Sequence, residues 1–211
     1  MPGLRLLKRN LILDFDDTLV HLVRPWLKWL RTRGITDKIY HPEDVHSYDW
    51  FKVKFGDKAS DFFLKNSNQT YETHDSHIPG SITFLKWAEK YFNLKIVTHV
   101  SNNHVLQAKT NFIKKVYEEN NKINIHVEFF EELNDKYKYI DGILIDDYPR
   151  HIINHISYNK QPAILFDYQG KNGWSKIKDY GYLTDELQPN LKYYSYATTY
   201  EQIKNILKEY I

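Results

Sequence analysis

Five short apolar runs alternate with helical patterns along this 211-residue chain, and this alternation limits the fold more than any other feature. Each run is a few residues long and mostly apolar, as expected for a strand buried on both faces of a parallel sheet. The runs cover residues 11–15, 94–100, 123–129, 142–147 and 163–167. Strand–helix alternation of this kind predicts an α/β fold with a doubly wound parallel sheet.

Helix signals occupy the segments between these runs. A helix is expected over residues 81–92, with Ser81 as its N-cap after a Pro-Gly pair. A second pattern with apolar residues near helical spacing covers residues 102–120. The segment 199–211 predicts a closing amphipathic helix with one apolar face.

Residues 19–78 interrupt this rhythm because they contain no apolar run typical of a parallel strand. They do contain three segments with helical character, which cover residues 24–34, 41–56 and 58–72. A structureless loop of this length is rare in a compact domain. We therefore expect a small helical cap over residues 19–78, inserted after the first strand of a core formed by residues 1–18 and 79–211.

The composition narrows the classes of function. The net charge is +2, from 29 basic and 27 acidic side chains, which gives no strong case for nucleic acid or an acidic membrane as a partner. The chain has no cysteine, so disulfides, thiolate metal sites and cysteine nucleophiles are excluded. The first apolar run is too short for a membrane span, and no signal-peptide cleavage pattern is seen. We expect a cytoplasmic protein without a membrane partner.

Acidic residues crowd the ends of two predicted strands. Asp14, Asp16 and Asp17 lie at the end of the first run, and Asp146 and Asp147 end the fourth. Ligands of open α/β sheets bind beyond the carboxyl ends of the strands. Carboxylates from two distant segments at one edge favour a hard cation, and Mg²⁺ is the cofactor we expect. The cation would offset the repulsion between neighbouring carboxylates.

These residues carry a family resemblance. DFDDT at residues 14–18 resembles the DxDx[TV] signature of the haloacid dehalogenase superfamily of phosphatases. Thr98, Lys136 and the Asp146-Asp147 pair stand in the order of the three later motifs of that superfamily. The resemblance spans most of the chain. It implies a Rossmann-like core, a Mg²⁺ cofactor and phosphatase activity.

Three looser similarities point to the 5'(3')-deoxyribonucleotidases within this superfamily. The segments are PEDVHSYDWFKVKFG at 42–56, HIPGSITFLKWAE at 77–89, and GILIDD at 142–147 with LFDYQGKNGWSKIKDY at 165–180. This resemblance implies a nucleoside 5'-monophosphate as the substrate. It implies a small-molecule partner, no stable nucleic-acid partner, and at most a second copy of the chain as a protein partner.

The superfamily resemblance also implies a role for each motif residue. Asp14 would be the nucleophile that forms an aspartyl-phosphate. Asp16 would protonate the leaving alkoxide and then activate water for the second step. Thr98 would donate a hydrogen bond to a phosphoryl oxygen. Lys136, preferred over Lys138 because of its spacing from Asp146, would neutralise phosphoryl charge.

Metal and substrate contacts follow from the same resemblance. The implied metal ligands are Asp14, the backbone carbonyl of Asp16, Asp147 and, with lower priority, Asp146. The implied substrate contacts are Thr18, Tyr48, Trp50, Phe51 and His99. The three aromatic residues among them would stack on a nucleobase, which presents a π-face whatever its identity. Packing inside the cap is an equal alternative for these aromatic side chains.

Several other conspicuous residues are expected to have structural roles only. Asp17 stands where many superfamily members have glycine, and we expect it to hold the turn, since Asp tolerates unusual backbone angles. Trp26 and Trp29 are expected in the core of the cap. The histidine pairs, His74 with His77 and His151 with His155, lack a third ligand nearby and are interpreted as surface or packing residues.

Three alternatives to a nucleotidase remain at this stage. A small-metabolite phosphatase would use the same motifs. A polynucleotide 3'-phosphatase would need a basic channel and a small or absent cap, and the near-neutral charge and the long insertion argue against it. A non-catalytic binding protein on the same fold would be signalled by loss of Asp14 or Asp16, and both residues are present.

Overall fold

The computed structural model describes residues 8–47, 49–65, 70–71, 76–131, 133–175 and 188–211. Within these ranges one sheet of six parallel strands has the order β3-β2-β1-β4-β5-β6. The strands are β1 Asn10–Leu13, β2 Asn93–His99, β3 His126–Phe130, β4 Ile143–Asp146, β5 Ala163–Phe166 and β6 Tyr194–Ala197. The predicted α/β class with a parallel sheet is confirmed.

Alternation of side chains along β1 explains why helices cover both faces of the sheet. Leu11 and Leu13 point to one face, and Ile12 points to the other, because successive residues of a strand alternate. All three side chains are completely buried. A strand that is apolar at every position is stable only where both of its faces are covered.

Helices α5 Ser81–Ala88, α6 Asn103–Phe112 and α8 Tyr200–Leu207 cover the face that carries Leu11 and Leu13. Helix α7 Pro149–Asn154 covers the opposite face, where Ile152 packs with Ile12. A 3₁₀ segment, Leu133–Tyr139, precedes β4. The sheet is therefore doubly wound, as the alternation of strands and helices predicted.

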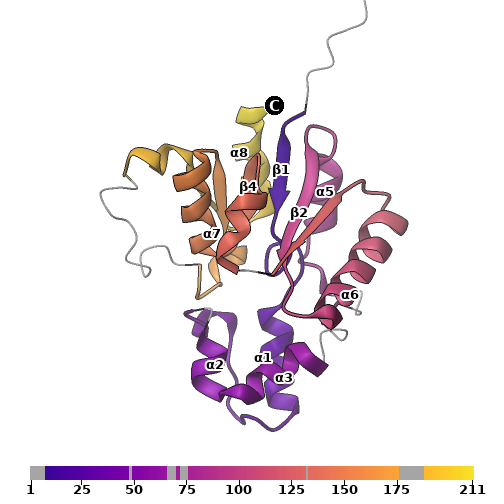
Figure 1. The fold of residues 1–211 in the computed structure, drawn as a ribbon, viewed down its shortest axis with the longest axis vertical. Helices are drawn as coiled ribbons and strands as arrows, with labels where there is room; N and C mark the ends of the chain where they lie inside the picture. The colour runs from indigo at the N-terminus through magenta and orange to yellow at the C-terminus, as the bar shows by residue number, and fades with distance from the viewer. Residues whose placement is uncertain (1–7, 48, 66–69, 72–75, 132, 176–187) are drawn as a thin grey trace, which may run out of the picture.

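Helices α1 Val23–Thr32, α2 Trp50–Phe55 and α3 Asp57–Lys65 follow β1 in the chain. Figure 1 shows them grouped beyond the carboxyl ends of the strands, away from the chain terminus at Ile211. They share an apolar core that includes Leu30, Val45 and Phe62. An insertion of helices after the first strand is thus observed, while its exact bounds at 19 and 78 stay a prediction.

Some predicted boundaries were wrong. Ser81 is the first helical residue and Gly80, with φ +93°, occupies the N-cap, because the preceding turn needs a left-handed residue. The helix ends at Ala88, four residues earlier than predicted. The pattern over 102–120 continues beyond α6 as a π-helical segment, Ile113–Glu119.

The strand β6 was not predicted from the sequence. It covers Tyr194–Ala197, of which two residues are half-buried, one is exposed and one is buried. A strand at the edge of the sheet has fewer apolar neighbours, so it lacks the continuous apolar pattern that identified the inner strands. Strand β3, on the opposite edge, begins three residues later than expected. Across the described ranges, no helix combines the length and the apolar character needed to cross a membrane.

Candidate active site at the carboxyl edge of the sheet

The topology brings the two acidic segments together. Strand β1 lies between β2 and β4, where the direction of winding reverses, and such switch points are where α/β sheets bind ligands. Leu13 pairs with Ile145, and the amide of Asp14 donates to the carbonyl oxygen of Ile145 at 2.9 Å. Asp14 and Asp146 therefore leave the sheet side by side, although they are far apart in the sequence.

Lys136 lies between these two carboxylates. Its Nζ donates to Asp14 Oδ1 and, at 2.6 Å, to Asp146 Oδ2, and the side chain is completely buried. Burial alone would lower the pKa of Lys136, but Asp14 and Asp146 raise it above its ordinary value. Lys138, the alternative that the sequence offered, is exposed.

Burial raises the pKa of Asp14 to about 6, although Lys136 opposes the rise. For Asp146 burial acts in the same direction, but Lys136 and His151 outweigh it and hold the pKa of Asp146 well below its ordinary value. Two adjacent carboxylates thus have opposite shifts. The surroundings therefore favour the ionised form of Asp146 and the protonated form of Asp14.

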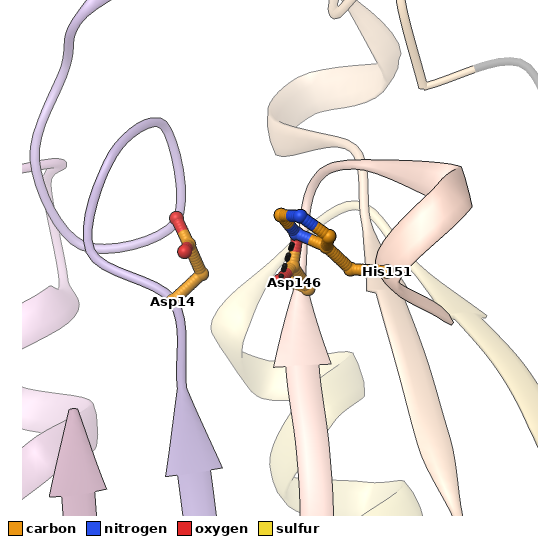
Figure 2. Close-up of side chains that lie close together, drawn as sticks. All are labelled: Asp14, Asp146 and His151. Atoms are coloured by element: carbon orange, nitrogen blue, oxygen red, sulfur yellow. Dashed lines mark hydrogen bonds and ion pairs between the residues drawn. The ribbon is translucent and has the colours of Figure 1, made fainter. Parts of the chain in front are cut away.

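His151 is a site residue that the sequence interpretation missed. Its Nδ1 lies 3.0 Å from Asp146 Oδ2, and Figure 2 shows its ring beside that carboxylate and facing Asp14. The other oxygen of Asp146 accepts from the backbone amide of Tyr148 at 2.8 Å. Pro149 starts α7 one residue after the Asp146-Asp147 pair, and a helix that starts there turns His151 back onto Asp146. His155, by contrast, packs in the core as expected.

Asp147 is held by contacts from two other parts of the chain. Its Oδ2 accepts from the indole Nε1 of Trp174 at 2.5 Å, and Thr18 Oγ1 lies 3.5 Å from its Oδ1. The hydroxyl of Ser175 donates to the backbone carbonyl of Asp147 at 2.6 Å. Burial and the nearby charge of Asp14 raise the pKa of Asp147 well above its ordinary value.

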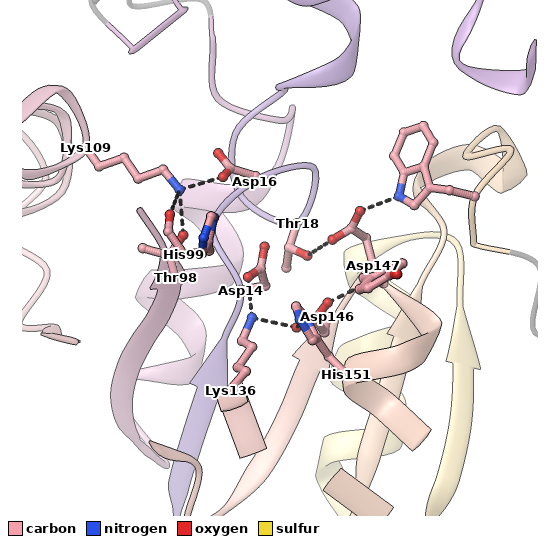
Figure 3. A network of polar contacts seen from close by, with 12 residues as sticks. Asp14, Asp16, Thr18, Thr98, His99, Lys109, Lys136, Asp146, Asp147 and His151 are labelled. Atoms are coloured by element: carbon pink, nitrogen blue, oxygen red, sulfur yellow. Dashed lines mark hydrogen bonds and ion pairs between the residues drawn. The ribbon is translucent and has the colours of Figure 1, made fainter. Parts of the chain in front are cut away.

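Asp16 points to the other side of the site, as Figure 3 shows. Tyr71 donates its hydroxyl to Asp16 Oδ1 at 2.7 Å, and Lys109 Nζ lies 2.5 Å from Asp16 Oδ2. Lys109 is 1% exposed and was not identified from the sequence. A lysine inside an amphipathic helical pattern is usually a surface residue, so its type and position carried no signal.

The expected role of Asp17 in the turn is confirmed. The residue has φ +49°, in the left-handed region that Asp tolerates better than most residues. Its carboxylate accepts from the backbone amides of Leu22 and Val23, both at 3.0 Å, where α1 begins. Burial raises the pKa of Asp17 to about 7, although these two hydrogen bonds oppose the rise.

The residues that end β2 lie where the sequence placed them. Thr98 is 1% exposed, and its Oγ1 accepts from Lys109 Nζ at 2.7 Å. His99 Nε2 lies 2.9 Å from the carbonyl oxygen of Glu131, and burial, followed by the charge of Lys109, lowers the pKa of His99. Both residues line the cavity between the sheet and the cap.

This cavity has a volume of about 290 Å³. Its floor includes Asp14, Asp16 and Thr98, and its cap side includes Trp26 and Phe51. The rings of Trp26 and Phe51 stack on each other, with centroids 3.7 Å apart and planes 5° apart. The cap side of the cavity also carries polar groups, which belong to Ser47, Asp49 and Lys52.

The aromatic residues considered as stacking partners for a base differ in their positions relative to the cavity. Phe51 lines the cavity and is 3% exposed. Trp50 packs edge-on against Tyr40 and Phe55 and is absent from the described cavity lining. Tyr48 lies outside the described residues. Trp26 and Trp29 belong to the cap core, as expected, and Trp26 also reaches the cavity.

The donor set fits a divalent metal ion. Ligand atoms of Asp14, Asp146 and His151 lie within 4.8 Å of one another. Lys136 already contacts both carboxylates of that triangle. The raised pKa values of Asp14 and Asp147 are those of buried carboxylates with too little positive charge beside them. A hard cation with oxygen ligands would supply that charge.

No protein-family model and no curated protein sequence matches this chain. Solved structures do match it along most of its length. A haloacid dehalogenase-like family hydrolase from Streptococcus pneumoniae has a TM-score of 0.58 and 12% identity, over 95% of this chain and 98% of the other. The HAD-hydrolase YfnB from Bacillus subtilis, in a form bound to magnesium, has a TM-score of 0.54 and 14% identity, over 95% and 99%. At such low identity the likeness establishes a shared fold.

Proposed function

We propose that this chain, whose fold is that of the haloacid dehalogenase-like hydrolases, is a Mg²⁺-dependent phosphomonoesterase that acts through an aspartyl-phosphate on Asp14. One observation carries the proposal. The Asp14 carboxylate lies buried at the floor of the cavity, with Lys136 bound to one of its oxygens and Asp16 on the same loop. A nucleophile, a cation and a second carboxyl group at one point are what phosphoryl transfer requires.

The first half of the reaction would take place at Asp14. Its free carboxylate oxygen attacks phosphorus while the bond to the leaving oxygen breaks, and Asp16 gives its proton to that oxygen. Lys136 holds Asp14 in place and offsets the negative charge that approaches it. The hydroxyl of Thr98 donates to a phosphoryl oxygen from the end of β2.

The second half would reverse the role of Asp16. Now ionised, Asp16 takes a proton from a water molecule that attacks phosphorus, and the bond to Asp14 breaks. Inorganic phosphate leaves and Asp14 is regenerated. Asp14, the backbone carbonyl of Asp16 and Asp147 would hold the Mg²⁺ ion, which would neutralise the charge of the phosphoryl group. Asp146 orients Lys136 and His151 around this group.

For the substrate we propose a nucleoside 5'-monophosphate. The support comes from the cap side of the cavity, where Phe51 presents an apolar aromatic surface backed by the ring of Trp26. Flat rings gain stacking energy on such a surface. Asp49 and Lys52, at the same side, provide groups that pair with the polar edge of a base.

A second candidate is a phosphatase for a small phosphorylated metabolite with an apolar body. The modest volume of about 290 Å³ favours it over a polymer end as the substrate. The cap also argues against a polynucleotide 3'-phosphatase, because helices α1 to α3 lie over the carboxyl edge of the sheet. The two small-molecule candidates differ only in the leaving group.

A phosphate-release panel with and without Mg²⁺ tests the proposal. It covers deoxyribonucleoside and ribonucleoside monophosphates, sugar phosphates and 3'-phosphorylated DNA. We expect Mg²⁺-dependent release from the nucleotides and none from Asp14→Asn. Full activity of Asp14→Asn contradicts the mechanism, and activity on the DNA end alone contradicts the proposed substrate.

Two neighbouring aromatic residues test the stacking surface. Phe51→Ala removes a ring that lines the cavity, whereas Trp50→Ala removes the adjacent ring, which packs elsewhere in the cap. We expect Phe51→Ala to raise KM for nucleotides about tenfold, as loss of one base stack does. Equal effects of the two variants on KM would contradict a direct contact between Phe51 and the base.

A further inference from the structure

Lys109 is the second buried lysine of the site, and the reaction described above does not use it. It lies on α6 and is 1% exposed. Its Nζ donates to Asp16 Oδ2 at 2.5 Å, to Thr98 Oγ1 at 2.7 Å and to the carbonyl oxygen of His99 at 2.7 Å. An ammonium group has three protons, so these contacts use all of its donors.

The two buried lysines contact different parts of the site. Lys136 binds the carboxylates of Asp14 and Asp146, on the metal side. Lys109 binds Asp16 and the end of β2, on the opposite side of Asp14 in Figure 3. Because its three protons are committed, Lys109 is not placed to bind the phosphoryl group itself. Its effect must pass through the residues it holds.

The surroundings of Lys109 support this reading. Its Nζ lies 5.6 Å from the ring centre of Phe15 and 5.8 Å from that of Tyr71, within the range of cation–π attraction. A buried ammonium is costly unless it is paired and hydrogen-bonded. Asp16 is its one carboxylate partner among the described ion pairs, so the lysine and this carboxylate stabilise each other.

We propose that Lys109 is a positioning residue for proton transfer, which fixes the carboxyl group of Asp16 and the hydroxyl of Thr98 toward the phosphoryl group. The proposal rests on the phosphatase function described above. Tyr71 and Lys109 each occupy one oxygen of Asp16, and each carboxylate oxygen has a second lone pair for the transferred proton. Thr98 accepts from Lys109, so its own proton is free to be donated toward the cavity.

The chemistry of the first step makes this role measurable. As the bond from phosphorus to the leaving oxygen breaks and the bond to Asp14 forms, the proton of Asp16 passes to the leaving oxygen. An alkoxide needs that proton, whereas p-nitrophenolate is stable without it. A residue that acts through Asp16 therefore matters more for alkyl phosphates than for p-nitrophenyl phosphate.

The experiment compares kcat for p-nitrophenyl phosphate and for a nucleoside monophosphate in the wild type, Lys109→Met, Asp16→Asn and the double variant. Lys95→Met is the matched control, because Lys95 lies on β2 and pairs with Glu128 away from the cavity. We expect Lys109→Met to lower kcat for the nucleotide by about a hundredfold and for p-nitrophenyl phosphate by less than about tenfold. In the Asp16→Asn background, Lys109→Met should cost less than about threefold.

The possible outcomes distinguish the positioning role of Lys109 from the phosphatase function. Equal losses on both esters, or full additivity with Asp16→Asn, would overturn the positioning role while the phosphatase function stands. A wild type that hydrolyses neither ester would overturn both. Thermal unfolding confirms that each variant is folded. If Lys109→Met does not fold, Lys109→Gln gives the same comparison, and Lys109→Arg, which keeps the charge, should lie between it and the wild type.

Discussion

Replacing Lys136 with methionine removes the cation that lies between two buried carboxylates. The side chain of Lys136 is 1% exposed, and those of Asp14 and Asp146 are 11% and 0% exposed. Methionine has nearly the length of lysine, so the variant fills the same space without the charge. Its effect on stability therefore measures the electrostatic contribution of the ammonium group.

The structure sets the size of this effect. Removing one partner of a buried ion pair costs about 3–5 kcal/mol, because the other charge stays buried without compensation. Here two carboxylates lose their shared partner, so we expect the upper part of that range, about 4–5 kcal/mol at pH 7. For a domain with a typical free energy of unfolding of about 5–15 kcal/mol, this is a large fraction.

The difference in free energy of unfolding between Lys136→Met and the wild type should also depend on pH and on Mg²⁺, which provides two further tests. Without Lys136, burial and mutual repulsion raise the pKa of a carboxylate in the folded state above its unfolded value. Such a group destabilises the fold at high pH, and the penalty disappears as the pH falls and the group takes up a proton. The difference between variant and wild type should therefore shrink from pH 7 to pH 5. Mg²⁺ should also reduce it by replacing the lost charge.

Urea unfolding followed by circular dichroism measures these differences, with Lys95→Met as the control. Lys95 and Glu128 form a partly exposed pair, whose loss should cost no more than about 1 kcal/mol. If Lys136→Met costs as little as Lys95→Met at pH 7, or if its cost is the same at pH 5 and pH 7, the assignment of Lys136 as the charge partner of Asp14 and Asp146 is refuted.

Three further predictions follow from other contacts. Trp174→Phe removes the indole donor to Asp147, and we expect the apparent Mg²⁺ affinity to fall about tenfold in calorimetric titration; an unchanged affinity would exclude Asp147 from the metal site. Gly173→Ala would place a Cβ 2.5 Å from the carbonyl oxygen of Val45, so the free energy of unfolding measured in urea should fall by about 1–3 kcal/mol. An unchanged free energy of unfolding would mean that the backbone around Val45 moves away at little cost. Burial lowers the pKa of His155 to about 4 from an unfolded value near 6.5, so the unfolded chain binds more protons as the pH falls. The free energy of unfolding should therefore drop by up to about 3 kcal/mol between pH 6.5 and 4, and it should depend less on pH in His155→Gln. The same pH dependence in the wild type and the variant would mean that other groups cause it.

The inner strands β1, β4 and β5 were predictable because each contains at least three consecutive apolar residues, a pattern typical of a strand that is covered on both faces. The candidate site followed from the same pattern, since Asp14 and Asp146 directly follow or end such strands. Parallel strands present their carboxyl ends at one edge, so the sequence alone indicated that these carboxylates meet. The edge strand β6 lacks the pattern and was missed.

The partners of those carboxylates were harder to predict. Lys109 is the one lysine of α6, and a lysine in such a helix is usually solvated, so only the packing of α6 against the sheet turns it inward. His151 sits in a short helix whose start at Pro149 determines its direction, and Trp174 reaches Asp147 from a loop after β5. Contacts between residues far apart in the chain leave no periodic signal.

The different positions of Phe51 and Trp50 relative to the cavity also result from tertiary packing. Both are aromatic and adjacent in the sequence, and for both the sequence left base stacking and packing inside the cap as equal alternatives. On α2 they point in different directions, so Phe51 reaches the cavity while Trp50 packs against Tyr40. The sequence by itself determined the fold class and the acidic edge of the sheet, because the alternation of apolar runs with helical patterns, and the acidic residues at the ends of those runs, are properties of neighbouring residues. Which lysine, histidine and aromatic rings complete that edge was decided only by tertiary packing, since it depends on how whole helices lie against the sheet.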